Sequence, residues 1–80
     1  MDDREIIDTI DRLVAEEHDL RQQRGAEPLS AGEAARLRSL EESLDQCWDL
    51  LRQRRARRQY GEDADEAAVR NVGVVEGYRQ

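Results

Sequence analysis

The spacing of apolar residues leaves this chain little choice of fold. Two stretches, residues 3–24 and 30–60, carry apolar side chains at alternating intervals of three and four positions. In the first stretch they are Ile6, Ile10, Leu13 and Leu20, with Glu17 in the missing step; in the second they are Leu37, Leu40, Leu44, Cys47 and Leu51. This spacing aligns residues along one side of an α-helix, and we call that line the seam of each helix. The sequence therefore predicts two amphipathic helices and an all-α fold.

The segment between the two stretches predicts a reversal of direction. Pro28 disfavours helical geometry in the residue before it. Ser30 with Glu33 three positions later is the pattern of a capping box, which marks the start of a helix. Gly61 is suited to end the second helix. Because the connection is short, we expect an antiparallel two-helix hairpin in residues 1–61, with helices over about 3–24 and 30–60, and a C-terminal tail over 62–80.

The antiparallel register makes specific pairs of residues neighbours. Folding about the break sets Ile6 level with Leu51 at one end of the seam. The same register brings the end of the second helix beside the first turn of the first helix. Three arginines would then face three acidic residues: Arg54, Arg55 and Arg58 opposite Asp2, Asp3 and Glu5. Opposite charges at this end favour the antiparallel pairing over a parallel one.

The small size of the chain predicts a partner. It has 80 residues and a single cysteine, so no internal disulfide supports it, and a core of this size contributes only about 3–5 kcal/mol. We expect the hairpin to form a homodimeric four-helix bundle with coiled-coil packing, or to bind a helical protein partner. The interface would include Ile6, Ile10, Leu13, Leu44, Trp48 and Leu51. Without a bilayer-spanning run or a secretory signal pattern, we expect a cytoplasmic protein with no membrane partner.

The run RQRRARR, residues 52–58, has two interpretations. It could contact the phosphates of a nucleic acid through Arg52, Arg54, Arg55, Arg57 and Arg58. Alternatively, it is the charged end of a helix whose apolar seam stops at Leu51, stabilised by the helix dipole and by the acidic first turn. The net charge of −6 opposes nucleic-acid affinity and favours the second interpretation.

Few residues have catalytic or metal-binding potential. Cys47 lies on the seam, where we expect burial rather than reactivity. Trp48 lies beside the seam and suits either an interface or a core position under the tail. His18 has no second histidine with which to build a metal site, and the serines have no base at a usable spacing. The sequence predicts no enzymatic activity, no metal and no cofactor.

The tail differs in character from the two helices. Asp63 and Glu66 are placed to cap one short helical turn. Beyond it, the valines are interrupted by Gly73, and an isolated extended piece has no strand to pair with. We expect an irregular tail that packs over its own hairpin, packs on another subunit or stays mobile.

A longer pattern points to a family. The run LDQCWDLLRQRRARR, preceded by LVAEEHDLR and followed by VEGYRQ, resembles a family of short actinobacterial proteins of unknown function. The resemblance covers nearly the whole chain. It implies a cytoplasmic all-helical hairpin and assigns no catalytic residues.

These features predict a small structural or regulatory module that acts through self-association or through a partner's helix. The alternative is a nucleic-acid-binding accessory protein that uses the arginine run. Steeply salt-dependent association with DNA or RNA would distinguish the alternative from the interaction module.

Overall fold

The computed structural model describes residues 2–24 and 27–77. Within these ranges the chain forms two long helices, α1 (Asp3–Arg24) and α2 (Ala31–Gln59), then a 3-10 turn η1 (Ala64–Glu66) and a short helix α3 (Val72–Gly77). The described residues contain no strand. The chain is therefore all-helical, as predicted from the spacing of its apolar residues.

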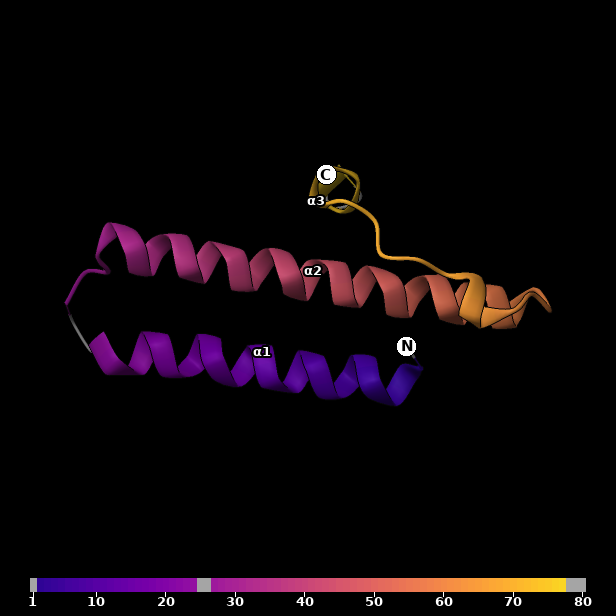
Figure 1. Ribbon diagram of the computed structural model, residues 1–80, viewed down its shortest axis with the longest axis horizontal. Helices are drawn as coiled ribbons and strands as arrows, with labels where there is room; N and C mark the ends of the chain where they lie inside the picture. The colour runs from indigo at the N-terminus through magenta and orange to yellow at the C-terminus, as the bar shows by residue number, and fades with distance from the viewer. Residues whose placement is uncertain (1, 25–26, 78–80) are drawn as a thin grey trace.

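The two long helices lie side by side and run in opposite directions (Figure 1). Near the connection, the guanidinium group of Arg36 lies 2.8 Å from the carboxylate of Glu16. At the other end, Arg54 lies 2.6 Å from Asp3. Both ion pairs agree with the predicted antiparallel register. The resulting body is elongated, with dimensions of 50 × 25 × 16 Å.

Both ends of α2 are set by local hydrogen bonds. At its start, the Glu33 amide donates to Ser30 Oγ at 3.2 Å, and the Ser30 amide donates to Glu33 Oε1 at 3.1 Å, which confirms the capping box. At its end, Gly61 has a φ of 74°, a left-handed conformation that suits glycine. The amides of Gly61 and Glu62 donate back to Arg58 and Arg57, which completes a Schellman motif.

The core lies in the half of the molecule that contains the N-terminus of α1. Ile6, Ile10, Leu50 and Leu51 form one buried cluster, and Cys47 and Leu44 pack against it. Cys47 packs against this cluster and is half-buried, so the burial expected at this seam position is present in part. Two helices alone enclose a narrow seam, and residues along its length keep one side open to solvent.

The tail is more regular than expected. Asp63 caps η1 through a hydrogen bond from the Asp65 amide at 2.9 Å. The expectation of an irregular tail is wrong for α3, because Asn71 accepts a bond from the Val74 amide at 2.9 Å and starts a helical turn there. Val75 of this short helix is fully buried.

The tail folds back along its own α2 (Figure 1). Two glutamine amides on α2 bind carbonyl oxygens of the returning chain: Gln53 donates to Ala68 at 2.7 Å and Gln46 donates to Arg70 at 3.2 Å. These bonds satisfy backbone groups that have no strand or helix partner. Of the three arrangements considered for the tail, the described part adopts packing over its own helices.

Truncating the core should destabilise the fold in proportion to burial. Leu51→Ala should lower the free energy of unfolding by about 2–5 kcal/mol, because Leu51 is 2% exposed and its removal leaves a cavity. Leu44→Ala should lower it less, because Leu44 is half-buried. Urea unfolding followed by circular dichroism measures both, with the exposed Val69→Ala as control. Equal losses for the two leucines would contradict this placement of the core.

Candidate interaction site

Arg54 is the buried member of the arginine run. Only 6% of the residue is exposed. Its Nε donates to Asp3 at 2.6 Å, and its Nη1 donates to the Asp65 carboxylate at 3.0 Å and to the Ala64 carbonyl at 3.2 Å. One guanidinium group therefore binds the first turn of α1 and the turn η1 at the same time, and it is not available to a ligand.

The remaining arginines of the run divide into two groups. Arg57 pairs with two acidic residues of the tail, and Arg58 pairs with Asp3. Arg52 and Arg55 are exposed and form no ion pair with the part of the chain that the structure describes. The run therefore presents two unpaired cations rather than a continuous row of five.

The expected contact between the arginines and the first acidic turn is present in part. Asp3 binds both Arg54 and Arg58, as the register predicts. Asp2 and Glu5 instead cap α1 reciprocally: the Glu5 amide donates to Asp2 at 2.8 Å, and the Asp2 amide donates to Glu5 at 3.3 Å. Sequence reasoning missed the acidic segment EDADE, residues 62–66, as a second source of partners, although it directly follows the arginines.

These ion pairs shift the protonation of both partners. Hydrogen bonds from Arg58, which has the larger effect, and from Arg54 lower the pKa of Asp3 from 3.8 to about 2. Hydrogen bonds to Asp3, which has the larger effect, and to Asp65 raise the pKa of Arg54. Each charge favours the ionised form of the other, so Asp3 and Arg54 are both charged at neutral pH.

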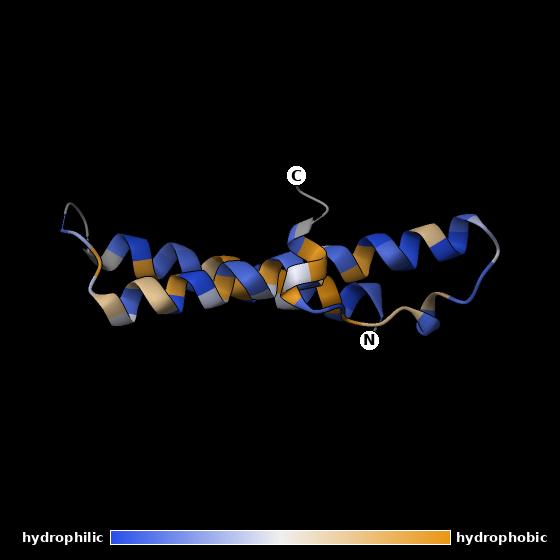
Figure 2. Cartoon of the chain, turned by 90° about the horizontal axis from the view of Figure 1, so that it is seen from above, coloured by the Kyte–Doolittle hydropathy of each residue, from blue (hydrophilic) through white to orange (hydrophobic). Residues whose placement is uncertain are grey.

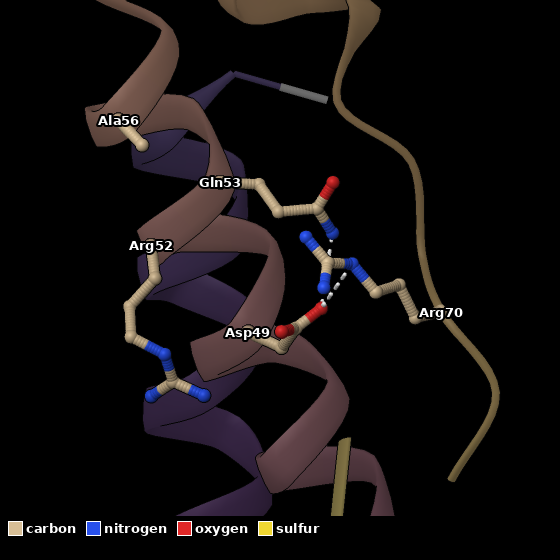
Figure 3. A pocket seen from close by; sticks show the side chains of 5 residues that line it. All are labelled: Asp49, Arg52, Gln53, Ala56 and Arg70. Carbon is tan, nitrogen blue, oxygen red and sulfur yellow. Dashed lines mark hydrogen bonds and ion pairs between the residues drawn. The ribbon is translucent and has the colours of Figure 1, made fainter. Parts of the chain in front are cut away.

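A second charged cluster fastens the tail to α2 (Figure 3). Asp49 is buried, and its Oδ2 accepts a bond from Gln53 at 3.0 Å and lies 3.5 Å from Nε of Arg70. These side chains line an open hollow of about 310 Å³ together with Arg52 and Ala56. The polar groups of Asp49 and Gln53 bind one another and the tail. The hollow is therefore the place where the tail is attached to α2.

A smaller hollow of about 240 Å³ lies between the two long helices and the tail. Its lining includes Cys47, Thr9, Leu50 and Val69. Burial raises the pKa of the Cys47 thiol, and the positive charge of Arg12 offsets part of that rise. A thiol with a raised pKa is a weak nucleophile at neutral pH.

The described residues contain no group of three or more histidine, cysteine, aspartate or glutamate side chains placed to hold a metal ion. His18 is exposed on α1. None of the helices in ranges 2–24 and 27–77 combines enough length with enough apolar character to cross a lipid bilayer.

The side of the helix pair that faces away from the tail carries exposed apolar side chains. Ile7, Val14 and Trp48 are 42%, 48% and 45% exposed. Each follows a seam residue by one position, which rotates it about 100° from the seam. In an antiparallel pair, residues one position after the seam lie on the same side of both helices. We call the surface formed by Ile7, Val14 and Trp48 the Trp48 face.

The tail covers the other side. Thr9, Gln46 and Leu50 each precede a seam residue by one position, and all three line the 240 Å³ hollow with Val69 of the tail. The helix pair therefore has one covered side and one open side. Figure 2 shows hydrophobic residues interspersed among hydrophilic ones along both long helices.

The six residues predicted for an interface fall into three groups. Ile6, Ile10 and Leu51 are enclosed in the core of the single chain. Leu13 and Leu44 are half-buried along the seam. Trp48 is the exposed member of the six, and the exposed Ile7 and Val14 were not among the residues predicted for the interface.

Comparison with known proteins places the chain in a family. The family model described as "Protein of unknown function (DUF2630)" matches residues 2–80. The chain belongs to this family. Two relatives are the uncharacterised proteins Rv0898c of Mycobacterium tuberculosis and Mb0922c of Mycobacterium bovis, each 53% identical over 77 residues, which is 95% of this chain and 88% of the relative. These actinobacterial relatives confirm the resemblance inferred from the sequence. No solved structure gives a significant match.

Asp3 should stabilise the fold only while it is ionised. Because its folded-state pKa is lowered from 3.8 to about 2, its contribution is complete above pH 3.8 and is lost as the pH falls toward 2. The difference in free energy of unfolding between the parent and Asp3→Asn should therefore be constant near neutral pH and shrink below pH 3.8. Urea unfolding at each pH measures it. The exposed Asp11→Asn is the control, and a difference that persists unchanged down to pH 2 would contradict the ion pairs.

Cys47 should react slowly with a thiol reagent in the folded protein. Burial both limits access and raises the pKa, so less thiolate is present. We expect labelling at pH 8 to be at least about tenfold faster in urea than in the native state. Arg38→Cys in a Cys47→Ser background supplies an exposed thiol on α2 as the control, which should react quickly in both conditions. Equal native rates at the two positions would contradict the placement of Cys47.

Proposed function

We propose that this chain is a small, non-enzymatic protein-interaction module of the cytoplasm, and that it acts by self-association. In this proposal α1 and α2 form a helical hairpin that pairs with a second copy into a four-helix bundle. The observation that carries the proposal is the Trp48 face, where three large apolar side chains are exposed together on the side that the tail leaves open.

The small core of the single chain supports this proposal. The buried hydrophobic cluster contains four residues, all in one half of the helix pair. Small domains without disulfides or metals often complete their cores by oligomerisation. A second copy placed on the Trp48 face would cover Ile7, Val14 and Trp48, and a tryptophan with neighbouring aliphatic side chains is a common energetic centre of interfaces.

The arginine run gives weaker support to the nucleic-acid alternative. Asp3 and the acidic residues of the tail already bind Arg54, Arg57 and Arg58. Two exposed arginines remain in the run, on a chain whose net charge is −6. Affinity for phosphate backbones grows with the number of phosphates neutralised, and two contacts supply little of it.

Two hollows in the described part of the chain support a non-enzymatic role. The one that contains Cys47 and Thr9 brings Arg12 near the thiol but no histidine or carboxylate to act as its base. The one that contains Asp49 is occupied by an internal ion pair with Arg70. Nucleophilic catalysis needs a nucleophile and a base within hydrogen-bond reach of each other.

Replacing Trp48 should weaken self-association selectively. Trp48→Glu places a charge at the centre of the Trp48 face and should raise the dimer dissociation constant about 30-fold or more. Tyr60→Glu makes a similar change at an exposed aromatic residue at the C-terminal end of α2, and should leave the constant unchanged. Sedimentation equilibrium over a range of protein concentrations measures all three proteins.

Two results would contradict this proposal. The first is a parent protein that is monomeric at every concentration tested. The second is salt-sensitive binding of the parent to a labelled DNA or RNA duplex with micromolar affinity that Arg52→Glu with Arg55→Glu removes, because that result would establish the nucleic-acid alternative.

A further inference from the structure

We propose that the second copy binds the Trp48 face end for end, so that Trp48 lies at the two-fold axis and Arg55 of each copy pairs with Glu41 of the other. This inference rests on the proposed self-association and adds the orientation of the two copies and the polar contacts that select it. The observation behind it is the arrangement of charge along α2.

Glu41, Trp48 and Arg55 form one stripe on α2. They are spaced seven positions apart, which is close to two helical turns, so they lie on the same side of the helix. All three are exposed. Because Trp48 belongs to the Trp48 face, the acidic and basic members of the stripe lie on that same side, one at each end of it.

Unpaired positive charge collects at one end of this face. Arg52 and Arg55 belong to the last turns of α2, and Arg4 belongs to the first turn of α1 beside them. All three are exposed and form no ion pair within residues 2–24 and 27–77. This end therefore has cations that the single chain does not neutralise.

The other end of the stripe carries Glu41, whose carboxylate can accept further hydrogen bonds. Glu41 is exposed, and one of its oxygens lies 3.2 Å from Nη2 of Arg21. An ionised carboxylate has about four acceptor positions, so one contact with Arg21 leaves room for a second guanidinium group. An arginine from another molecule would complete this partly used acceptor.

The two orientations of a dimer differ sharply in charge. In a parallel arrangement, Arg4, Arg52 and Arg55 of both copies would gather at one end, and like charges facing each other disfavour association. In the end-for-end arrangement, Arg55 lies seven positions beyond Trp48 and meets Glu41, which lies seven positions before it. A two-fold axis repeats each contact, so the dimer gains two such ion pairs.

Charge reversal tests the orientation. Arg55→Glu should raise the dimer dissociation constant about tenfold, because two attractive contacts become repulsive. Arg12→Glu makes the same change in charge at an exposed arginine of α1 that lies one position before a seam residue, on the side covered by the tail, and has no ion pair in the described ranges, so it should leave the constant unchanged. Mixing the Arg55→Glu protein with the Glu41→Arg protein should restore tight association as a heterodimer, because both ion pairs form again, one with its charges exchanged and one as in the parent.

A cross-linking experiment gives an independent readout of the same contact. In a Cys47→Ser background, the Arg55→Cys protein mixed with the Glu41→Cys protein should yield a mixed disulfide-linked dimer under mild oxidation, because a disulfide requires Cα atoms within about 7 Å. Predominant cross-linking of each protein to itself would overturn the end-for-end orientation.

The outcomes separate this inference from the proposed function. A parent dimer that Arg55→Glu does not weaken overturns the orientation and leaves self-association standing. A parent that stays monomeric overturns both. A parent dimer weakened by Arg55→Glu, unaffected by Arg12→Glu and restored by mixing supports both.

Discussion

The fold depends on one buried guanidinium group. Arg54 occupies the seam position that follows Leu51, where the spacing calls for an apolar side chain. Burying a charge is costly unless partners bind it, and here Asp3, Asp65 and the Ala64 carbonyl supply them. The aliphatic part of an arginine can cover apolar neighbours while its head group is bound. Three elements, α1, α2 and η1, therefore meet at a single side chain.

The need to satisfy this charge explains why the tail takes its path. Once α2 ends at the Schellman motif of Gly61, the acidic segment that follows lies beside Arg54 and Arg57. The chain then runs back along α2, held by Gln53 and Gln46 and by the pair of Asp49 with Arg70. Polar contacts guide the tail to one side of the helix pair, and Val75 adds the apolar contact that covers that side.

Much of this fold follows from local rules in the sequence. The three-four spacing identifies both long helices and their seam, Ser30 with Glu33 marks the start of α2, and the antiparallel register predicts the contact of Asp3 with Arg54. The path of the tail does not follow from such rules. It depends on single hydrogen bonds between glutamine side chains and distant carbonyl groups, and these leave no periodic pattern.

The same reason limits what the sequence says about the candidate site. Leu50 and Trp48 flank the seam symmetrically in sequence, and either could face solvent. Leu50 is buried and Trp48 is exposed because the tail packs on the side of the helix pair that carries Leu50. The Trp48 face is thus a consequence of long-range packing, although each of its residues can be located beside the seam from spacing alone.

Sharing Arg54 has a consequence for how the molecule opens. The first turn of α1 and the turn η1 bind different nitrogens of the same guanidinium group, so losing either partner leaves a buried cation less well satisfied and weakens the hold on the other. We therefore expect fraying of the first turn of α1 and release of η1 to be coupled, so that these two segments exchange their amide hydrogens together. The far end of the helix pair, where Arg36 pairs with Glu16, makes no contact with Arg54, so its opening is not linked through this side chain.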